Sequence, residues 1–293
     1  MEKKYVAWRN GRVDVYAMPA VSVEKDEALV KPLHVMLSDI EKHLFMGLFT
    51  SKTPVIIGST GVVKIIESSN GEQKSGRSLL VKPFGANGLL GVDADGLLSS
   101  YTGLHKSYFV TEVLEPRPHD ALKPLLTHAS LISSRVEADL AVVEGCGFLA
   151  LATALALILR GVDPVVFCRD PPKEFYYAGI KVAKHANELP GDPVPIVATT
   201  PDANMVYKAV EKVRPGRIVA SIVAKLNWVP VLTNRLEVIV ENDFSPIGDN
   251  VVELTHKLLK STRRYVRFEK VASIEDVLGL LPFTDLGLVV SFE

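Results

Sequence analysis

The chain has 293 residues, of which 47% are hydrophobic and 23% are charged, and its formal net charge is −1. A globular composition at this length predicts two domains. A near-neutral chain without a block of basic residues is a poor match for nucleic acid or an anionic membrane surface, so neither is expected as a partner.

The longest apolar run, residues 148–159, is too short to cross a bilayer and predicts a buried helix. The N-terminus carries no signal segment, so we expect a cytoplasmic protein. The sequence contains two cysteines, Cys146 and Cys168. Two cysteines in one nucleotide-binding unit make neither a disulfide framework nor a cysteine-based zinc site, so neither is expected.

Residues 1 to about 115 are predicted to be rich in β-strands. Short apolar runs are separated there by Gly, Asp, Asn and Ser, which are typical turn residues. The predicted strands are residues 4–8, 27–30, 55–57, 62–66 and 79–81. The polar residues 68–78 predict an exposed hairpin or loop, and the glycine-rich residues 85–103 predict a loop with little internal support.

From about residue 134 the pattern changes to strands that alternate with helices. An apolar run, residues 138–144, ends in the glycine-spaced turn GCGFLA at residues 145–150, and an apolar helix pattern follows. A second apolar run, residues 165–168, begins about 20 residues after the turn. This succession predicts the first strand, phosphate-binding turn, helix and second strand of a dinucleotide-binding unit. A merely structural strand–helix–strand turn is the alternative, because glycine-rich turns are common.

The residue types of this turn suit a phosphate ligand. Gly145 permits the tight turn out of the strand, and Gly147 lets a diphosphate approach the main chain. The main chain of Phe148 and Leu149 lies at the positive end of the helix dipole, which favours an anion. Ala150 is small enough for the helix and the strand to pack closely.

The end of the second strand indicates which dinucleotide binds. An Asp or Glu at this place would hold the ribose 2′-hydroxyl of NAD, but the chain has Cys168 followed by Arg169. A small neutral residue followed by Arg accommodates a 2′-phosphate, so the predicted cofactor is NADP. The alternative is that Arg169 is a solvated surface residue whose charge is partly offset by Asp170.

The alternation continues beyond the glycine turn. The predicted strands are residues 194–199, 217–223 and 237–240, and the predicted helix is residues 201–213. This pattern predicts a doubly wound parallel sheet with helices on both faces, which binds ligands at the carboxyl ends of its strands. Thr199, Ser221 and Asn242 lie at or just beyond such ends, although isolated polar residues after strands are often turn residues. The C-terminal segment predicts a helix at residues 250–260, a helix capped by Ser273 and a last strand at residues 286–292, which could pair with the N-terminal β-rich domain.

Three segments resemble the medium-chain dehydrogenase/reductase family. Residues 35–41 (VMLSDIE) resemble its V-C-G/H-T/S-D-x-H/E segment, and residues 53–60 (TPVIIGST) resemble its P-x-x-x-G-H-E segment. Residues 121–126 (ALKPLL) resemble its segment before the nucleotide domain. The nearest branch is the NADP-accepting glucose dehydrogenases, which share the neutral residue and Arg after the second strand, a Thr at position 199 and an Asn at position 242.

This resemblance implies an α/β chain with two domains. A β-rich GroES-like domain would comprise residues 1–132, with residues 245–293 returning to it. A Rossmann NADP-binding domain would comprise residues 133–244. The resemblance also implies a small-molecule substrate and a homo-oligomer.

The zinc ligands of the family are missing from this chain. Zinc-dependent members use a Cys, a His and a further acidic or cysteine residue, whereas the corresponding positions here are Met36, Ser59 and Thr60. The region of the third ligand offers Lys123 or, with a shifted alignment, His128. A thioether and neutral hydroxyls are poor zinc ligands and a Lys ammonium repels the ion, so no metal is predicted.

The catalytic candidates are Ser38, Glu41 and His128. In relatives, a Ser or Thr at the position of Ser38 passes the substrate proton towards solvent, and a residue at the position of Glu41 can finish that relay. His128 is placed near the expected cleft as a candidate general acid. The structural alternatives are a helix N-cap for Ser38 and Asp39, a solvated first-turn acid for Glu41, and a hydrogen-bonded histidine between the domains for His128.

Two kinds of function remain open at this point. The first is a zinc-independent, NADP-dependent oxidoreductase that transfers hydride to or from a small carbonyl, enone, quinone or alcohol. The second is a non-catalytic descendant of the family that binds nucleotide, or a protein partner, for regulation. A zinc-using sugar or alcohol dehydrogenase is a third possibility, which the missing ligands disfavour.

Overall fold

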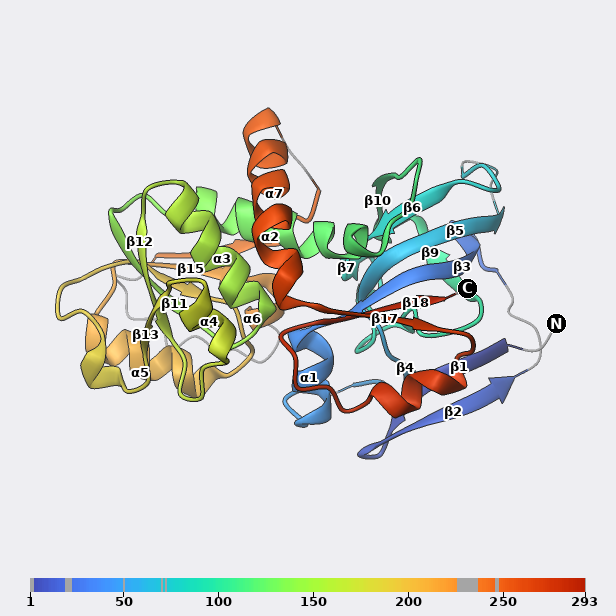
Figure 1. Cartoon of the computed structure of the whole chain (residues 1–293), viewed down its shortest axis with the longest axis horizontal. Coiled ribbons are helices and arrows are strands. Elements are labelled where there is room, and N and C mark those ends of the chain that lie inside the picture. Colours follow the sequence, from blue (N-terminus) through green and yellow to red (C-terminus); the bar gives the residue numbers. More distant parts are fainter. Residues whose placement is uncertain are drawn as a thin grey trace. The chain divides into compact units, whose positions relative to one another are not determined.

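The computed structural model describes residues 3–18, 23–49, 51–69, 71, 73–225, 237–245 and 248–292. The chain divides into two compact units (Figure 1). The first unit comprises residues 1–125 and 266–293, and the second comprises residues 126–265. The predicted domains divide after residues 132 and 244, whereas the units divide after residues 125 and 265, so residues 245–265 group with the second unit.

A seven-stranded sheet lies at the centre of the first unit. Its longest strand, β3 (Glu27–Leu37), pairs antiparallel with β5 (Thr60–Ser68) on one side. On the other side β3 pairs antiparallel with β9 (Thr102–His105) and β18 (Leu288–Phe292). The remaining strands of this sheet are β6 (Ser78–Val81), β10 (Phe109–Glu112) and β17 (Arg267–Val271). The pairing of β18 with β3 confirms that the C-terminal strand returns to the β-rich unit.

The other strands of the first unit form two small sheets. β2 (Arg12–Met18), β1 (Lys3–Arg9) and β4 (Val55–Ile56) make a three-stranded sheet, and β7 (Phe84–Gly85) pairs with β8 (Gly88–Leu89). Helix α1 (Asp39–Phe45) follows β3 directly. The described part of this unit also has three short 3₁₀ helices, η1 (Lys106–Tyr108), η2 (Pro118–Leu122) and η5 (Glu275–Leu280), and a fourth, η4 (Arg263–Tyr265), ends the second unit.

The glycine-rich residues 85–103 are well packed, which corrects the predicted loop with little internal support. Four of the leucines in this segment are fully buried, namely Leu89, Leu90, Leu97 and Leu98. A Cβ at Gly96 would lie 2.7 Å from the main-chain oxygen of Ile57. The glycine therefore allows a close approach to neighbouring main chain that a larger residue would prevent.

The second unit contains a six-stranded sheet in which every pairing is parallel. The sheet order is β13 (Lys181–Ala183), β12 (Asp163–Phe167), β11 (Leu140–Glu144), β14 (Ile196–Ala198), β15 (Arg217–Ser221) and β16 (Glu237–Glu241). The chain therefore begins in the middle of the sheet, runs to one edge, and then returns to β14 and runs to the other edge. This is the strand order of a Rossmann fold, and the direction reverses between β11 and β14. The predicted doubly wound parallel sheet is confirmed.

Helices cover both faces of this sheet. The helices are α2 (Lys123–Ser134), α3 (Phe148–Leu159), α4 (Lys173–Tyr177), α5 (Ala203–Val213), α6 (Ile222–Lys225) and α7 (Asp249–Thr262), with the 3₁₀ helix η3 (Ala186–Glu188). The right-handed crossovers through α3 and through α5 run in opposite directions, which places these two helices on opposite faces. On the face of α5, Val206 and Ala209 of the helix pack against Val142 and Ile196 of the strands.

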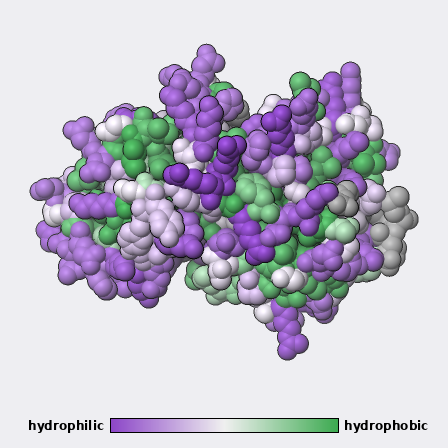
Figure 2. All heavy atoms as spheres, in the orientation of Figure 1, coloured by the Kyte–Doolittle hydropathy of each residue, from purple (hydrophilic) through white to green (hydrophobic). Residues whose placement is uncertain are grey.

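None of the described helices combines the length and the apolar character that a bilayer crossing requires. Helix α3 is apolar throughout, but it has 12 residues and most of them are buried. Figure 2 shows hydrophilic side chains over much of the presented face, with hydrophobic side chains in smaller patches.

Candidate functional site

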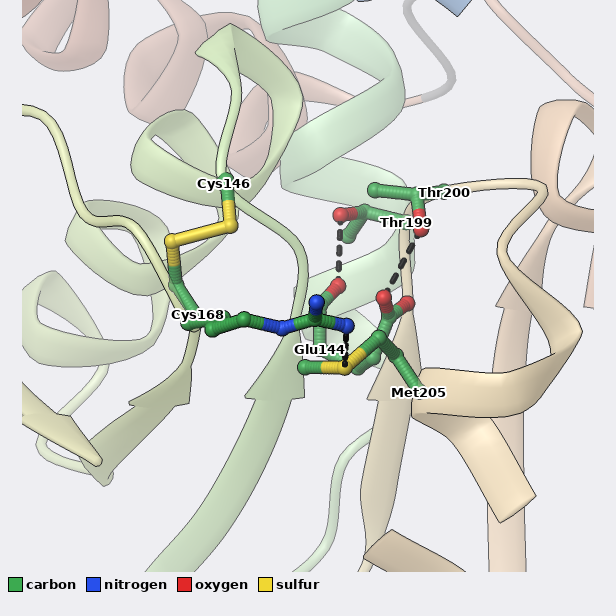
Figure 3. The surroundings of a disulfide bond; sticks show 7 residues. Glu144, Cys146, Cys168, Thr199, Thr200 and Met205 are labelled. Atoms are coloured by element: carbon green, nitrogen blue, oxygen red, sulfur yellow. Dashed lines mark hydrogen bonds between the residues drawn. A yellow bond between two sulfur atoms is a disulfide. The ribbon is translucent and has the colours of Figure 1, made fainter. Parts of the chain in front are cut away.

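The glycine turn after β11 packs directly against the residues that follow β14. Gly145 has a φ of +138°, and a Cβ there would overlap Thr199 Oγ1 and lie 2.9 Å from Thr200 Cγ2. Thr199 Oγ1 donates a 2.7 Å hydrogen bond to the main-chain oxygen of Glu144 (Figure 3). A residue without a Cβ is therefore required at position 145, at the point of the sheet where Rossmann folds bind their ligands.

Helix α3 begins immediately after this turn, with Gly147 as its N-cap. The side chains of Phe148 and Leu149 are buried, with 0% and 4% of their surface exposed. These three predicted phosphate-binding residues thus meet at the N-terminal end of α3, where the main chain rather than the apolar side chains would contact a ligand.

Cys146 and Cys168 form a disulfide bond (Figure 3), contrary to the expectation from the sequence. Cys146 is the middle residue of the glycine turn, Cys168 follows the last residue of β12, and their Cα atoms are 5.1 Å apart. Strands β11 and β12 are parallel neighbours, with Glu144 beside Phe167 in the register. The expectation was wrong because a single bridge needs no framework, only two strand ends that lie side by side.

Arg169, the next residue, is exposed, as the solvated alternative supposed. Its Nη2 donates to the sulfur atom of Met205, at 4.0 Å, and a thioether is a weak acceptor. Met205 lies in the first turn of α5, which Asp202 caps. The guanidinium group therefore has a weak partner in the described part of the chain and can turn to a stronger anionic one.

Glu144, the last residue of β11, is a buried acid that the sequence analysis missed. It is 1% exposed, its Oε1 accepts a 2.7 Å hydrogen bond from Thr200 Oγ1, and its Oε2 has no hydrogen-bond partner among the described residues. Burial raises the pKa of Glu144 to about 8, although the hydrogen bond from Thr200 acts in the opposite direction. The carboxyl group is therefore mostly neutral at pH 7. An acid at the end of an otherwise apolar run was the signal in the sequence.

Ser221 and His128, two predicted site residues, contact each other in the second unit. His128 Nε2 lies 2.8 Å from Ser221 Oγ, and His128 Nδ1 lies 2.6 Å from the main-chain oxygen of Asp243. Because a carbonyl oxygen can only accept, we assign the proton to Nδ1, so the Ser221 hydroxyl donates to Nε2. The imidazole ring is fully buried and stacks on Phe244, with 4.0 Å between the ring centroids. Burial lowers the pKa of His128 to about 4.

His128 belongs to the second unit, as do its partners Ser221, Asp243 and Phe244, so this side chain is a hydrogen-bonded core histidine of that unit. Its ring is neutral at pH 7, and both nitrogen atoms are engaged within the chain. Asn242, the third predicted residue at a strand end, follows β16 and is exposed.

Ser38, Glu41 and Ser59 form a buried cluster in the first unit. Glu41 Oε2 accepts a 2.7 Å hydrogen bond from Ser38 N, and Glu41 Oε1 accepts a 2.8 Å hydrogen bond from Ser59 N. Ser38 is the N-cap of α1 and forms a capping box with Glu41, which confirms the N-cap alternative for Ser38. The solvated acid proposed for Glu41 is wrong, because the side chain is 1% exposed. Burial raises the pKa of Glu41, and hydrogen bonds from Ser38 and Ser59 oppose that shift.

Of the residues at the zinc-ligand positions, Ser59 belongs to this cluster, and Met36 and Thr60 lie on two paired strands. Met36 of β3 is opposite Thr60 of β5, and Thr60 Oγ1 donates a 2.6 Å hydrogen bond to the main-chain oxygen of Val81. The Ser59 hydroxyl is buried without a hydrogen-bond partner in the part of the chain that the structure describes. Within that same part, no three or more His, Cys, Asp or Glu residues are grouped so that they could hold a metal ion.

Comparison of the sequence with protein-family models finds no match, and comparison with curated proteins finds none either. Solved structures, in contrast, match over nearly the whole chain. A zinc-binding dehydrogenase from Sinorhizobium meliloti 1021, described as putative and bound to NADP, is 15% identical with a TM-score of 0.70, covering 99% of each chain. CAD from Helicobacter pylori complexed with NADP(H) is 15% identical with a TM-score of 0.71, covering 99% of this chain and 98% of that one.

A third match is acetophenone reductase from Geotrichum candidum NBRC 4597 in complex with NAD. It is 11% identical with a TM-score of 0.73 and covers 99% of this chain and 97% of that one. Similarity at these identities establishes the fold. The chain has the fold of the alcohol dehydrogenases of the medium-chain type, a GroES-like β-rich part and a Rossmann part, as the sequence resemblance implied. The particular likeness to glucose dehydrogenases stays a prediction.

Proposed function

We propose that the chain is a zinc-independent, NADP-dependent oxidoreductase that transfers hydride to or from a small carbonyl, enone, quinone or alcohol. The observation that carries this proposal is the glycine turn at the reversal point of the parallel sheet, with Arg169 after the neighbouring strand. The putative dehydrogenase of this fold from Sinorhizobium meliloti is bound to NADP, and CAD from Helicobacter pylori, of the same fold, is complexed with NADP(H), which supports the choice of cofactor.

The residues of the turn fit a dinucleotide in several respects. The space beside Gly145 is one that a Cβ would fill, so main chain can approach a ligand there. The neutral form of Glu144 avoids a negative charge next to a bound diphosphate. Arg169 offers a cation for a 2′-phosphate and has a weak partner otherwise. The bridge between Cys146 and Cys168 opposes this fit, because it links the turn to the end of β12.

Each proposed residue has a place in the binding of NADP, which supplies or accepts the hydride when it is bound. The diphosphate would contact Gly145, Gly147, Phe148 and Leu149. The 2′-phosphate would contact Cys168 and Arg169. The residues on the nicotinamide side would be Thr199, Ser221 and Asn242. The Thr199 and Ser221 hydroxyls already have partners within the chain, so we assign them a role in shaping the site.

Ser38 and Glu41 are the proposed residues for the substrate proton. A carboxyl group whose pKa is raised by burial exchanges protons closer to neutral pH than an exposed one does. His128 is assigned a positioning role, because it holds Ser221 and is uncharged at neutral pH with both nitrogen atoms in use. Zinc plays no part in this proposal, because the ligand positions hold Met36, Ser59 and Thr60, whose side chains are poor ligands.

Titration of the protein with NADPH and NADH tests the proposal. Wild type should bind NADPH more tightly than NADH, and Arg169→Ala should reduce that preference by about 10- to 100-fold, the value of a lost charge-assisted hydrogen bond of roughly 1.5–3 kcal/mol. Lys212→Ala is the matched control, because Lys212 is an exposed cation in the last turn of α5, whereas Arg169 contacts Met205 in the first turn of that helix. Equal affinities for the two coenzymes in wild type would contradict the assigned role of Arg169.

A non-catalytic nucleotide-binding protein is the second candidate. The observation in its favour is that the Ser38–Glu41 pair and His128 all have hydrogen-bond partners within the chain. A panel of quinones, enones, aldehydes and alcohols separates the two candidates. Oxidation of NADPH or reduction of NADP with any of them supports the enzyme, and binding without turnover over the whole panel supports the second candidate.

A further inference from the structure

The Cys146–Cys168 bridge joins the two strand ends that the proposed function assigns to the coenzyme. Cys146 is in the turn that follows β11, and Cys168 is directly after β12. Figure 3 shows the bridge next to Glu144 and Thr199, the residues that position the turn. The bond is therefore at the phosphate-binding turn itself, not at a remote point of the fold.

A bound dinucleotide needs the space across which this bond runs. In a Rossmann fold the turn contacts the diphosphate and the end of the second strand contacts the ribose at its 2′ position. The adenosine ribose connects these two groups, so it must lie over the gap between the turn and the strand end. In this chain the gap is closed by a covalent link, with 5.1 Å between the two Cα atoms.

The turn does not depend on the bridge for its position. Gly145 N donates a 3.2 Å hydrogen bond to the main-chain oxygen of Phe167, and Cys168 N donates a 3.0 Å hydrogen bond to that of Ala183. Thr199 holds the turn from the other side. Reduction would therefore leave the main chain in place, and the two separate thiols could rotate away from the gap into other χ1 rotamers.

The two cysteines differ in their exposure. Cys168 is fully buried, whereas Cys146 is partly exposed. An incoming thiolate can therefore reach the bridge from the side of Cys146, which is a condition for thiol–disulfide exchange.

We propose that Cys146 and Cys168 are a reversible thiol–disulfide modification site that controls coenzyme binding. The oxidised protein binds NADPH weakly, and the reduced protein binds it tightly. This inference rests on the proposed NADP-binding function and adds to it a dependence on dithiol reductants.

A dithiol reduces the Cys146–Cys168 bridge by thiol–disulfide exchange. One thiolate of the dithiol attacks the Cys146 sulfur, the Cys146–Cys168 bond breaks, and Cys168 leaves as a thiolate that takes up a proton. The second thiol of the reductant then displaces Cys146, which also ends as a thiol, and the reductant leaves as a disulfide. Two electrons and two protons reach the protein. A small disulfide such as oxidised glutathione carries out the reverse exchange and leaves as two thiols.

The experiment compares NADPH affinity in two proteins, wild type and Cys146→Ser, each as the full chain and each under oxidising and reducing conditions. Wild type is oxidised with oxidised glutathione or reduced with dithiothreitol, and Cys146→Ser is measured under both conditions. The titration of accessible thiols in denaturant reports the redox state independently of any activity. We expect no thiols in the oxidised form and two in the reduced form, at least tenfold tighter NADPH binding after reduction, and tight binding by Cys146→Ser that does not respond to dithiothreitol. Cys146→Ala provides a second variant in case the first fails to fold.

Several results would overturn this inference. Equal NADPH affinity in the oxidised and reduced forms, or tighter binding by the oxidised form, would show that the bridge does not close the site while leaving the proposed function intact. Two thiols that persist after treatment with oxidised glutathione would show that the bridge does not form. Binding of neither NADPH nor NADH by any sample would overturn the proposed function together with this inference.

Discussion

Two buried ionisable side chains of the second unit, Glu144 and His128, are neutral at pH 7 in the folded protein for the same physical reason. Burial disfavours the charged form of each side chain, so it raises the pKa of the acid to about 8 and lowers the pKa of the imidazole to about 4. Because an acid gains charge as pH rises and a base gains charge as pH falls, the two residues should make stability depend on pH in opposite directions.

Relative to wild type, Glu144→Gln should gain free energy of unfolding as pH rises from about 4.5 to 8, because the variant lacks a contribution that falls over this interval. The pKa of Glu144 is raised on folding, so over this interval the folded protein holds a proton that the unfolded chain has lost, and stability falls as pH rises. Each pKa unit corresponds to about 1.4 kcal/mol. Urea unfolding at pH 5, 6.5 and 8 measures the slope. Glu211→Gln, a change of an exposed acid on α5, should keep the wild-type slope, and an unchanged slope in Glu144→Gln would refute the argument.

Relative to wild type, His128→Asn should lose less free energy of unfolding as pH falls from about 6.5 to 4. The pKa of His128 is lowered to about 4 on folding, so the stability it contributes is present above about pH 6.5 and is lost as pH falls towards 4, by a total on the order of 3 kcal/mol. The Asn variant should be less stable than wild type at pH 7, because it loses the stacking on Phe244, but it should lose less on acidification. His256→Asn, at an exposed position of α7, is the control. Parallel curves for His128→Asn and wild type would rule out this role.

At the scale of single elements, helix α1 shows how a short helix can hold a buried cluster. It has seven residues, so its own main-chain hydrogen bonds give it little stability. The capping box between Ser38 and Glu41 satisfies donors at its first turn, and Glu41 also accepts from Ser59, which links the helix to the chain that leads into β5. The proposed proton-handling residues therefore also determine where this helix begins.

Ser38→Ala should destabilise the protein by about 1 kcal/mol, because the side-chain cap of α1 is lost. Ser38→Thr keeps a hydroxyl group and should retain most of that stability. If Ser38 also handles the substrate proton, the Ala variant should lose turnover with a changed pH profile, whereas the Thr variant should keep both. Thermal unfolding and the pH dependence of turnover measure the two effects separately. Wild-type stability in Ser38→Ala would contradict the capping role.

The glycine turn depends on residues that are distant in the sequence. Its conformation is set by Thr199 and Thr200, which follow β14, as much as by the glycines themselves. An element that begins at residue 145 therefore depends on residues more than fifty positions away in the chain. This dependence explains why a glycine-spaced motif is informative only when the strands around it occupy the right places in the sheet.

For the whole molecule, the glycine turn lies in the Rossmann part, whereas Met36, Ser59 and Thr60, at the positions of the zinc ligands in the family that the sequence resembles, lie in the β-rich part. The two parts have separate sheets and separate cores, so residues of one could change while the other kept its structure. Under the proposed function, which uses no zinc, the protein suits acceptors that are already electrophilic, because no Lewis acid is then needed to polarise them.

Metal analysis of the purified protein should find far less than one zinc ion per chain. The positions of the zinc ligands in the family that the sequence resembles hold a thioether and two hydroxyls, all from buried residues. Treatment with a chelator should leave NADPH binding and thermal stability unchanged. One zinc ion per chain that resists dialysis would instead support a zinc-using dehydrogenase and require ligands other than Met36, Ser59 and Thr60.

The sequence by itself determined the order of the elements and the class of the fold. The alternation of apolar strands and helices from residue 134 onwards, the glycine turn, and the return of the last strand are all confirmed. These features follow from periodicity and turn residues, which act over a few neighbours in the chain and are therefore visible in the sequence.

Only the tertiary structure decided which side chains meet. The bridge between Cys146 and Cys168 requires β12 to lie next to β11, and the burial of Glu41 requires the main chain at Ser59 to reach it. The burial of the leucines in residues 85–103 and the neutral state of Glu144 likewise depend on strands that are distant in sequence. Local patterns specify elements, whereas exposure, pairing and protonation are set by neighbours that the packing of those elements brings together.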